Sequence, residues 1–88
     1  MVIKMYDYLI NEYVNKLTLK EIKEFAYKQG IELTQSELDL IYDTIKKHWR
    51  TFVHGNPRPI FEDIKTRVRP ITYNKIENLY IDVKKRFL

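Results

Sequence analysis

Apolar residues recur at intervals of three and four along most of the chain, which is the spacing of one face of an α-helix. The pattern predicts helices over about residues 3–15, 19–28, 35–53, 59–68 and 73–87. The short connections between them favour helix hairpins, and 88 residues are too few for two layers of sheet. We therefore predict an all-α fold: a single helical domain over residues 1–88, built as a small bundle of four to five helices with short helix-hairpin connections.

Helix-start signals occur at three places, in segments 17–22, 33–38 and 71–76. In the first, Thr18 is placed to accept a hydrogen bond from the backbone N–H of Glu21, whose carboxylate returns to the Thr18 backbone. The second segment repeats this capping box, and the third retains the threonine and its apolar neighbours but lacks the carboxylate. We expect a helix to begin directly after the threonine of each segment.

Helix ends are marked by glycine and proline. Gly30 is expected to adopt the left-handed conformation and to end the second helix, with Ile31 folding back onto that helix. Gly55 is expected to end the third helix in the same way, and Pro57 prevents its continuation. Pro70 disfavours helical geometry in the residue before it and so ends the fourth segment.

Two of these motifs, L-T-x-x-E-I over 17–22 and G-I-x-L-T over 30–34, stand beside a long third helix and a final helix that ends near residue 87. In this arrangement the chain resembles the YqfT-like small proteins of Gram-positive bacteria, over most of its length. Proteins of that family are helical and functionally uncharacterised. The resemblance therefore implies a bacterial helical protein, and it implies no substrate, cofactor or catalytic residue.

Composition narrows the class of protein. A content of 44% hydrophobic and 14% aromatic residues indicates an ordered globule, although 32% of the residues are charged. The absence of cysteine excludes disulfides, thiolate zinc sites and cysteine nucleophiles, and it fits a reducing compartment. Charged residues interrupt the N-terminal region, so it lacks the apolar core of a signal peptide, and no window is apolar enough to span a membrane. We expect a cytoplasmic protein with no membrane partner.

Candidate catalytic chemistry is sparse. His48 and His54 are six residues apart, which is not the spacing of a helical zinc pair. Ser36 lies within a capping box rather than at a nucleophile elbow, and the two glycines are too far apart to form a phosphate-binding loop. We predict a non-enzymatic protein with no catalytic residue, no metal site, no cofactor and no small-molecule substrate.

The net charge of +4 is unevenly distributed along the chain. Residues 1–44 hold five Lys/Arg against eight Asp/Glu, or −3, whereas residues 45–88 hold eleven against four, or +7. Helix dipoles explain part of this asymmetry, since acidic residues begin the third helix and basic residues end it. A solvated helix face is the simpler interpretation of the remainder. The alternative is an anionic partner such as nucleic acid, because clustered cations displace phosphate counterions. The candidate basic surface consists of Lys46, Lys47, Arg50, Arg58, Lys65, Arg67 and Arg69.

Tyrosine is abundant, and Tyr8, Tyr27 and Tyr73 fall outside the predicted apolar faces. We expect these three side chains to be exposed. Tyrosine is enriched at protein interfaces, although a helix surface can also carry aromatic residues without any such role. Together with the charge asymmetry, they favour a protein-binding module: a protein partner or self-association, with the acidic half of one copy facing the basic half of another. Nucleic acid is the second candidate partner.

Overall fold

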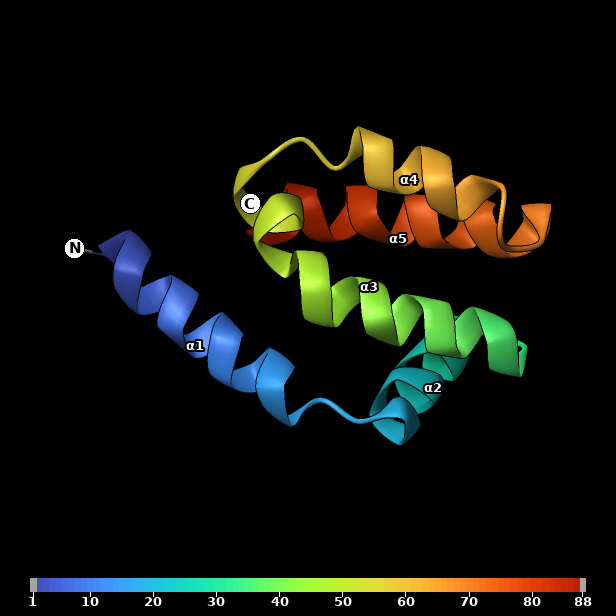
Figure 1. The fold of residues 1–88 in the computed structure, drawn as a ribbon, viewed down its shortest axis with the longest axis horizontal. Helices are drawn as coiled ribbons and strands as arrows, with labels where there is room; N and C mark the ends of the chain where they lie inside the picture. The colour runs from blue at the N-terminus through green and yellow to red at the C-terminus, as the bar shows by residue number, and fades with distance from the viewer. Residues whose placement is uncertain (1, 88) are drawn as a thin grey trace.

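The computed structural model describes residues 2–87, and five helices account for most of them (Figure 1). The prediction of an all-α bundle is confirmed, and no strand occurs within the described residues. The helices are α1 (Val2–Lys16), α2 (Leu19–Lys28), α3 (Gln35–His54), α4 (Arg58–Lys65) and α5 (Pro70–Phe87). None of them is both long enough and apolar enough to cross a membrane.

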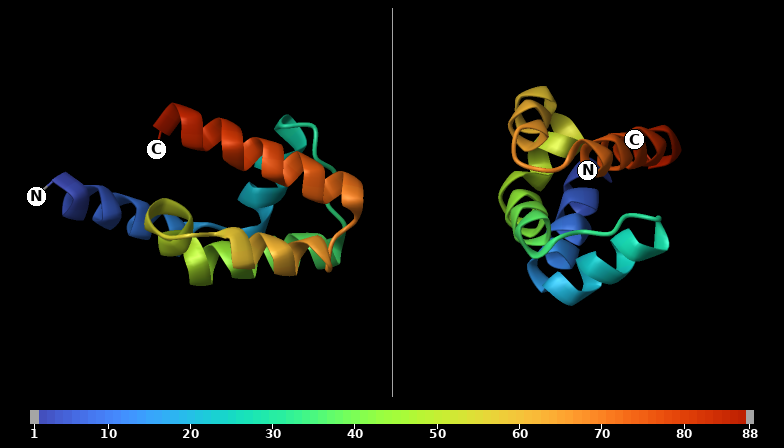
Figure 2. Two further views of the ribbon diagram at one scale, coloured as in Figure 1. Left: turned by 90° about the horizontal axis from the view of Figure 1, so that it is seen from above. Right: turned by 90° about the vertical axis from the view of Figure 1, so that its right-hand side faces the viewer.

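The helices are arranged on two sides of α3. Helices α1 and α2 both pack against α3, and α4 and α5 pack against each other as an antiparallel hairpin (Figures 1 and 2). The hairpin lies on the opposite side of α3 from α2 (Figure 1). The molecule therefore has two helical units, α1–α3 and α4–α5, that meet along α3.

Aromatic rings join these two units near the C-terminal end of α3. The ring of Phe52 on α3 lies edge-on to Phe61 of α4 and to Tyr80 of α5, with centroid distances of 5.6 and 5.8 Å. Phe61 also contacts Tyr73 at 6.4 Å, and Ile64 completes the buried centre of the cluster. Edge-to-face contacts of this kind contribute about 0.5 to 1.5 kcal/mol each beyond the burial of apolar area.

The capping boxes at the starts of α2 and α3 are confirmed. The Thr18 side chain accepts a hydrogen bond from the Glu21 backbone N–H at 3.2 Å, and the Thr18 N–H donates to the Glu21 carboxylate at 3.2 Å. Thr34 and Glu37 make the same pair of bonds at 3.2 and 3.0 Å. Two of the four N–H groups that each helix leaves unpaired at its start are thereby satisfied, which fixes where both helices begin.

The two glycines end their helices differently. Gly30 has a φ of +78°, and the Ile31 N–H donates to the Ala26 carbonyl at 2.8 Å, so α2 ends in the predicted left-handed turn. The same prediction for Gly55 is wrong, since its φ and ψ of −109° and −160° are extended. Its N–H still bonds to the Thr51 carbonyl at 2.9 Å, so α3 ends without a left-handed residue.

Helix α4 ends at Lys65, about three residues earlier than the sequence pattern suggests. The Thr66 hydroxyl donates to the carbonyl of Asp63 at 2.8 Å. A side-chain hydroxyl that binds a nearby carbonyl in this way competes with the regular backbone ladder and favours a helix end.

Helix α5 begins at Pro70, one turn earlier than expected, and this places Tyr73 inside the molecule. Proline is favoured at the first helical position because it has no N–H to leave unpaired. Because residue 73 lies one turn inside the helix instead of at its first position, Tyr73 shares a face with Ile76 and Tyr80. The prediction of an exposed Tyr73 is wrong, since it is only 8% exposed. Its hydroxyl donates to the Glu77 carboxylate at 2.9 Å, and this bond, together with burial, raises the pKa of Tyr73.

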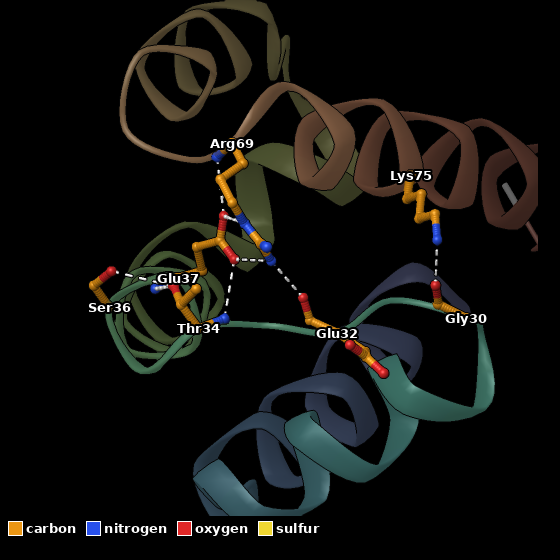
Figure 3. A network of polar contacts seen from close by, with 7 residues as sticks. All are labelled: Gly30, Glu32, Thr34, Ser36, Glu37, Arg69 and Lys75. Carbon is orange, nitrogen blue, oxygen red and sulfur yellow. Dashed lines mark hydrogen bonds and ion pairs between the residues drawn. The ribbon is translucent and has the colours of Figure 1, made fainter.

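A buried carboxylate links the start of α3 to the start of α5 (Figure 3). Glu37 is 2% exposed, and its Oε2 accepts a hydrogen bond from the Arg69 backbone N–H at 2.9 Å. The Arg69 guanidinium donates to both carboxylate oxygens, at 3.2 and 3.0 Å, and to the Glu32 carbonyl at 2.7 Å. We call this arrangement the Glu37–Arg69 clamp. Arg69, one of the candidate basic residues, is therefore already bound to Glu37 and to the Glu32 carbonyl, although half of its side chain is exposed.

The clamp holds Glu37 in its charged form. Burial raises the pKa of Glu37, but hydrogen bonds from Arg69, Thr34 and Thr72 outweigh it, and the pKa lies at about 2 instead of 4.5. A carboxyl whose pKa is lower in the folded state stabilises the fold above its unfolded pKa. That stabilisation is present at neutral pH and is lost as the pH falls from 4.5 towards about 2.

Substitution Glu37→Gln should lower the free energy of unfolding at neutral pH by about 2 to 3 kcal/mol, because it removes the ion pair and weakens a helix cap. It should also flatten the loss of stability between pH 4.5 and about 2, since glutamine does not titrate there. Urea denaturation followed by circular dichroism over this pH range measures both effects.

Glu21→Gln is the matched control. Glu21 occupies the same capping position in α2, but it is exposed and has no arginine partner among the described residues. We expect a cost below about 1 kcal/mol and an unchanged acid response. Equal losses in both variants would show that the clamp adds nothing to an ordinary helix cap.

Candidate functional site

An apolar groove of about 430 Å³ lies between the α1–α3 unit and the α4–α5 hairpin. All five helices contribute to its wall, and almost every side chain that faces it is aliphatic or aromatic. The lining comprises Tyr13, Val14, Leu17, Glu21, Ile22, Phe25, Ala26, Ile31, Leu33, Ile41, Thr44, Ile45, Trp49, Phe52, Val53, Phe61, Ile64, Ile76, Leu79 and Tyr80.

The groove exists because the two units are joined at particular points instead of along a continuous packed face. At one end the Glu37–Arg69 clamp joins them, and beside it the Lys75 ammonium donates to the Gly30 carbonyl at 2.5 Å (Figure 3). At the other end the Tyr80 hydroxyl donates to the Phe52 carbonyl at 3.3 Å. Apolar side chains between these contacts face the groove.

Two aromatic side chains on the groove wall extend into solvent. Tyr13 of α1 is 65% exposed and Phe25 of α2 is 52% exposed. Both residues fall at the helical spacing of the apolar residues in their helices, a position that favours burial, yet both are exposed. Each helix has an apolar arc wider than its contact with α3, so Val14 and Ala26 are buried while their neighbours are not. An apolar arc that is wider than one helix contact is therefore the sequence signal of an exposed apolar surface. In α1 this arc also includes Leu9, which is exposed.

Two polar contacts hold this wall of the groove against α3. In the first half of α1, the carboxylate of Asp7 lies 2.6 Å from Nε2 of His54 at the end of α3. Near its end, the Lys46 ammonium donates to the Asn15 carbonyl at 3.0 Å. These contacts set the position of α1, and Tyr13 lies between them.

Three side chains of the groove wall use oxygen atoms in hydrogen bonds within the fold. The Thr44 hydroxyl donates to the Leu40 carbonyl at 2.7 Å, Tyr80 is bound to α3, and Glu21 caps α2. The groove therefore offers mainly apolar surface. Among residues 2–87, no three His, Asp or Glu side chains lie close enough together to hold a metal ion.

Three of the seven candidate basic residues are paired with carboxylates. The Lys47 ammonium lies 2.9 Å from Asp43, and the Arg67 guanidinium lies 3.0 Å from Asp63, each pair being one turn apart on its helix. Both pairs border a polar cleft between α3 and α4. Arg69 belongs to the clamp. The structure thus places acidic groups beside the cations of this cleft, which lowers its positive potential.

The other basic candidates are dispersed over the two units. Lys46 is bound to α1, and Arg50 lies over the ring of buried Trp49 at 4.4 Å. Lys65 lies over the ring of Tyr73 at 5.7 Å. The Arg58 backbone N–H binds the Asn56 side chain at 3.1 Å, which positions the start of α4.

The predicted exposure of two tyrosines is confirmed. Tyr8 is 63% exposed and Tyr27 is 71% exposed. Tyr27 borders a separate cleft with Ile71 and Lys75, whereas Tyr8 lies on α1. Neither tyrosine lines the apolar groove. Their role in binding stays a prediction.

No family model, curated protein or solved structure matches the chain. The resemblance to the YqfT-like proteins therefore stays a prediction.

Proposed function

We propose that the protein is a non-enzymatic interaction module that binds an amphipathic helix of a protein partner in the apolar groove. The observation that carries the proposal is the groove itself, with its wall of aliphatic and aromatic side chains and with Tyr13 and Phe25 exposed at its mouth. Exposed aromatic side chains bring large apolar area to an interface at low cost in conformational entropy.

The size of the groove suits a short row of side chains. A cavity of about 150 Å³ in a protein core holds one group the size of benzene, so a volume of about 430 Å³ holds about three large apolar side chains. An amphipathic helix presents that number on one face, at positions i, i+3 or i+4, and i+7. This correspondence favours a helix as the bound element.

The chemistry of the lining separates this function from binding of a polar small molecule. Small-molecule sites combine an apolar wall with a few polar groups that converge on the ligand. Here Thr44, Tyr80 and Glu21 use their oxygen atoms within the fold. The groove therefore favours a ligand with an apolar surface, such as the apolar face of a helix.

Nucleic-acid binding through the basic C-terminal half is the second candidate. The observation in its favour is that Arg50, Arg58 and Lys65 have no carboxylate partner among the described residues. Buried Trp49 and Phe61 weigh against it, since a ring within the core does not stack on a base.

Selection of displayed peptides against the full chain tests the proposed function. We expect enrichment of helical sequences with apolar residues at i, i+4 and i+7, because the groove accommodates one helix face. Phe25→Glu should lower the affinity of the protein for the selected peptides at least about tenfold, since it places a charge at the groove mouth. Tyr27→Glu is the matched control, as Tyr27 is also exposed on α2 but lies outside the groove. Equal weakening by both substitutions, or no enrichment, would reject the proposal.

A titration at low salt tests the second candidate. We expect fluorescence anisotropy of a labelled single-stranded oligonucleotide to show no binding at micromolar protein, since three of the seven candidate cations are already paired with carboxylates. Binding that weakens steeply with salt, and weakens further in Arg58→Ala and Lys65→Ala, would favour nucleic acid over the helix-binding function.

A further inference from the structure

Helix α1 is itself an amphipathic helix with an uncovered apolar side. Leu9 and Tyr13, one turn apart, are 62% and 65% exposed, whereas Val14 faces α3 and is buried. Helix α1 lies at the edge of the molecule, and α3 is the helix that it packs against (Figures 1 and 2). The chain thus contains both an apolar groove and, on the wall of that groove, a helix whose apolar side has no partner within the described fold.

We infer that the helix bound in the apolar groove is α1 of a second copy of this chain. The protein is then a symmetric homodimer, in which Leu9 and Tyr13 of each copy pack into the groove mouth of the other. This inference rests on the proposed function and names its partner.

The available area is sufficient for a dimer. At about 200 Å² for a fully exposed large side chain, the exposed fractions of Leu9, Tyr13 and Phe25 amount to about 350 Å² of mostly apolar surface per copy when all three are covered. Homodimer interfaces are about two-thirds apolar, so this patch corresponds to about 1,100 Å² of total buried surface. That is close to the roughly 1,000 Å² that marks the lower end of specific interfaces, which fits a dimer that dissociates on dilution.

The charges that flank this patch are complementary under two-fold symmetry. Glu12 and Lys16 lie one turn apart on α1, beside Leu9 and Tyr13, and neither has an ion-pair partner within residues 2–87. If two copies of α1 pair antiparallel about the level of Val14, Glu12 of each copy lies level with Lys16 of the other. Symmetry forms both pairs at once, and the same surface of each copy is used, which closes the assembly at two chains.

The surroundings of α1 permit two copies to approach. Residues 2–28, which form α1, α2 and the link between them, hold five Lys/Arg against four Asp/Glu. A nearly balanced surface of mixed sign carries little long-range repulsion between copies. Self-association therefore does not require the acidic half of one copy to face the basic half of another.

Light scattering coupled to size-exclusion chromatography tests the dimer in the full chain. We expect a dimer at high micromolar concentration that dissociates on dilution. Leu9→Glu should raise the dissociation constant at least about tenfold, since it buries a charge in an apolar contact. Tyr8→Glu is the matched control: Tyr8 is equally exposed, but it lies about 100° further around the helix, and its substitution should leave the dimer intact. Circular dichroism confirms folding of both variants.

A charge exchange tests the antiparallel arrangement. Glu12→Lys and Lys16→Glu should each weaken the dimer, because each brings like charges together across the two-fold axis. The double variant should recover the affinity of the unchanged chain. Failure of the double variant to recover would overturn this arrangement of α1.

The outcomes separate the two proposals. If the unchanged chain is monomeric at every concentration, or if Tyr8→Glu dissociates it as strongly as Leu9→Glu, the inferred dimer is overturned. Binding of selected helical peptides that is sensitive to Phe25→Glu would then leave the proposed function in place. If the chain is monomeric and no peptide binds, both proposals fail.

Discussion

One ion pair determines how the two halves of the molecule meet. Arg69 reaches Glu37 across 32 positions of sequence, and the same carboxylate caps α3 and binds the backbone at the start of α5. A buried anion is costly unless it is fully hydrogen-bonded, so alternative placements of the α4–α5 hairpin that leave Glu37 unpaired are strongly disfavoured. The clamp thus acts on specificity as well as on stability, because it selects one orientation of the hairpin relative to α3.

The apolar groove is a consequence of this orientation. Because polar contacts join the two units at one end and aromatic rings join them at the other, the apolar arcs of α1 and α2 are left without a covering helix. A closed five-helix bundle would bury these arcs and gain stability from the buried area. Natural proteins depart from full burial mainly where a surface is used, and on the groove wall the exposed side chains are Tyr13 and Phe25.

Features encoded by neighbouring residues could be predicted from the sequence, and features that depend on distant residues could not. Thr18 and Thr34 specify helix starts through bonds to residues three positions ahead, and Gly30 specifies a helix end through its own φ. The burial of Tyr73 and the pairing of Arg69 depend on where α5 docks, which no local pattern contains. Likewise, the apolar arc of α1 predicts burial along its whole width. Only the structure shows that α3 covers one part of this arc and leaves the rest exposed.

The separation of Glu37 from Arg69 along the chain also affects the order of folding. The α2–α3 and α4–α5 pairs form between helices that are adjacent in sequence, so their contacts close short loops and form quickly. The clamp must close a loop several times longer, which costs more chain entropy. We therefore expect it to form after both helix pairs are in place. The contact that gives the native state its single arrangement is then among the last to be made.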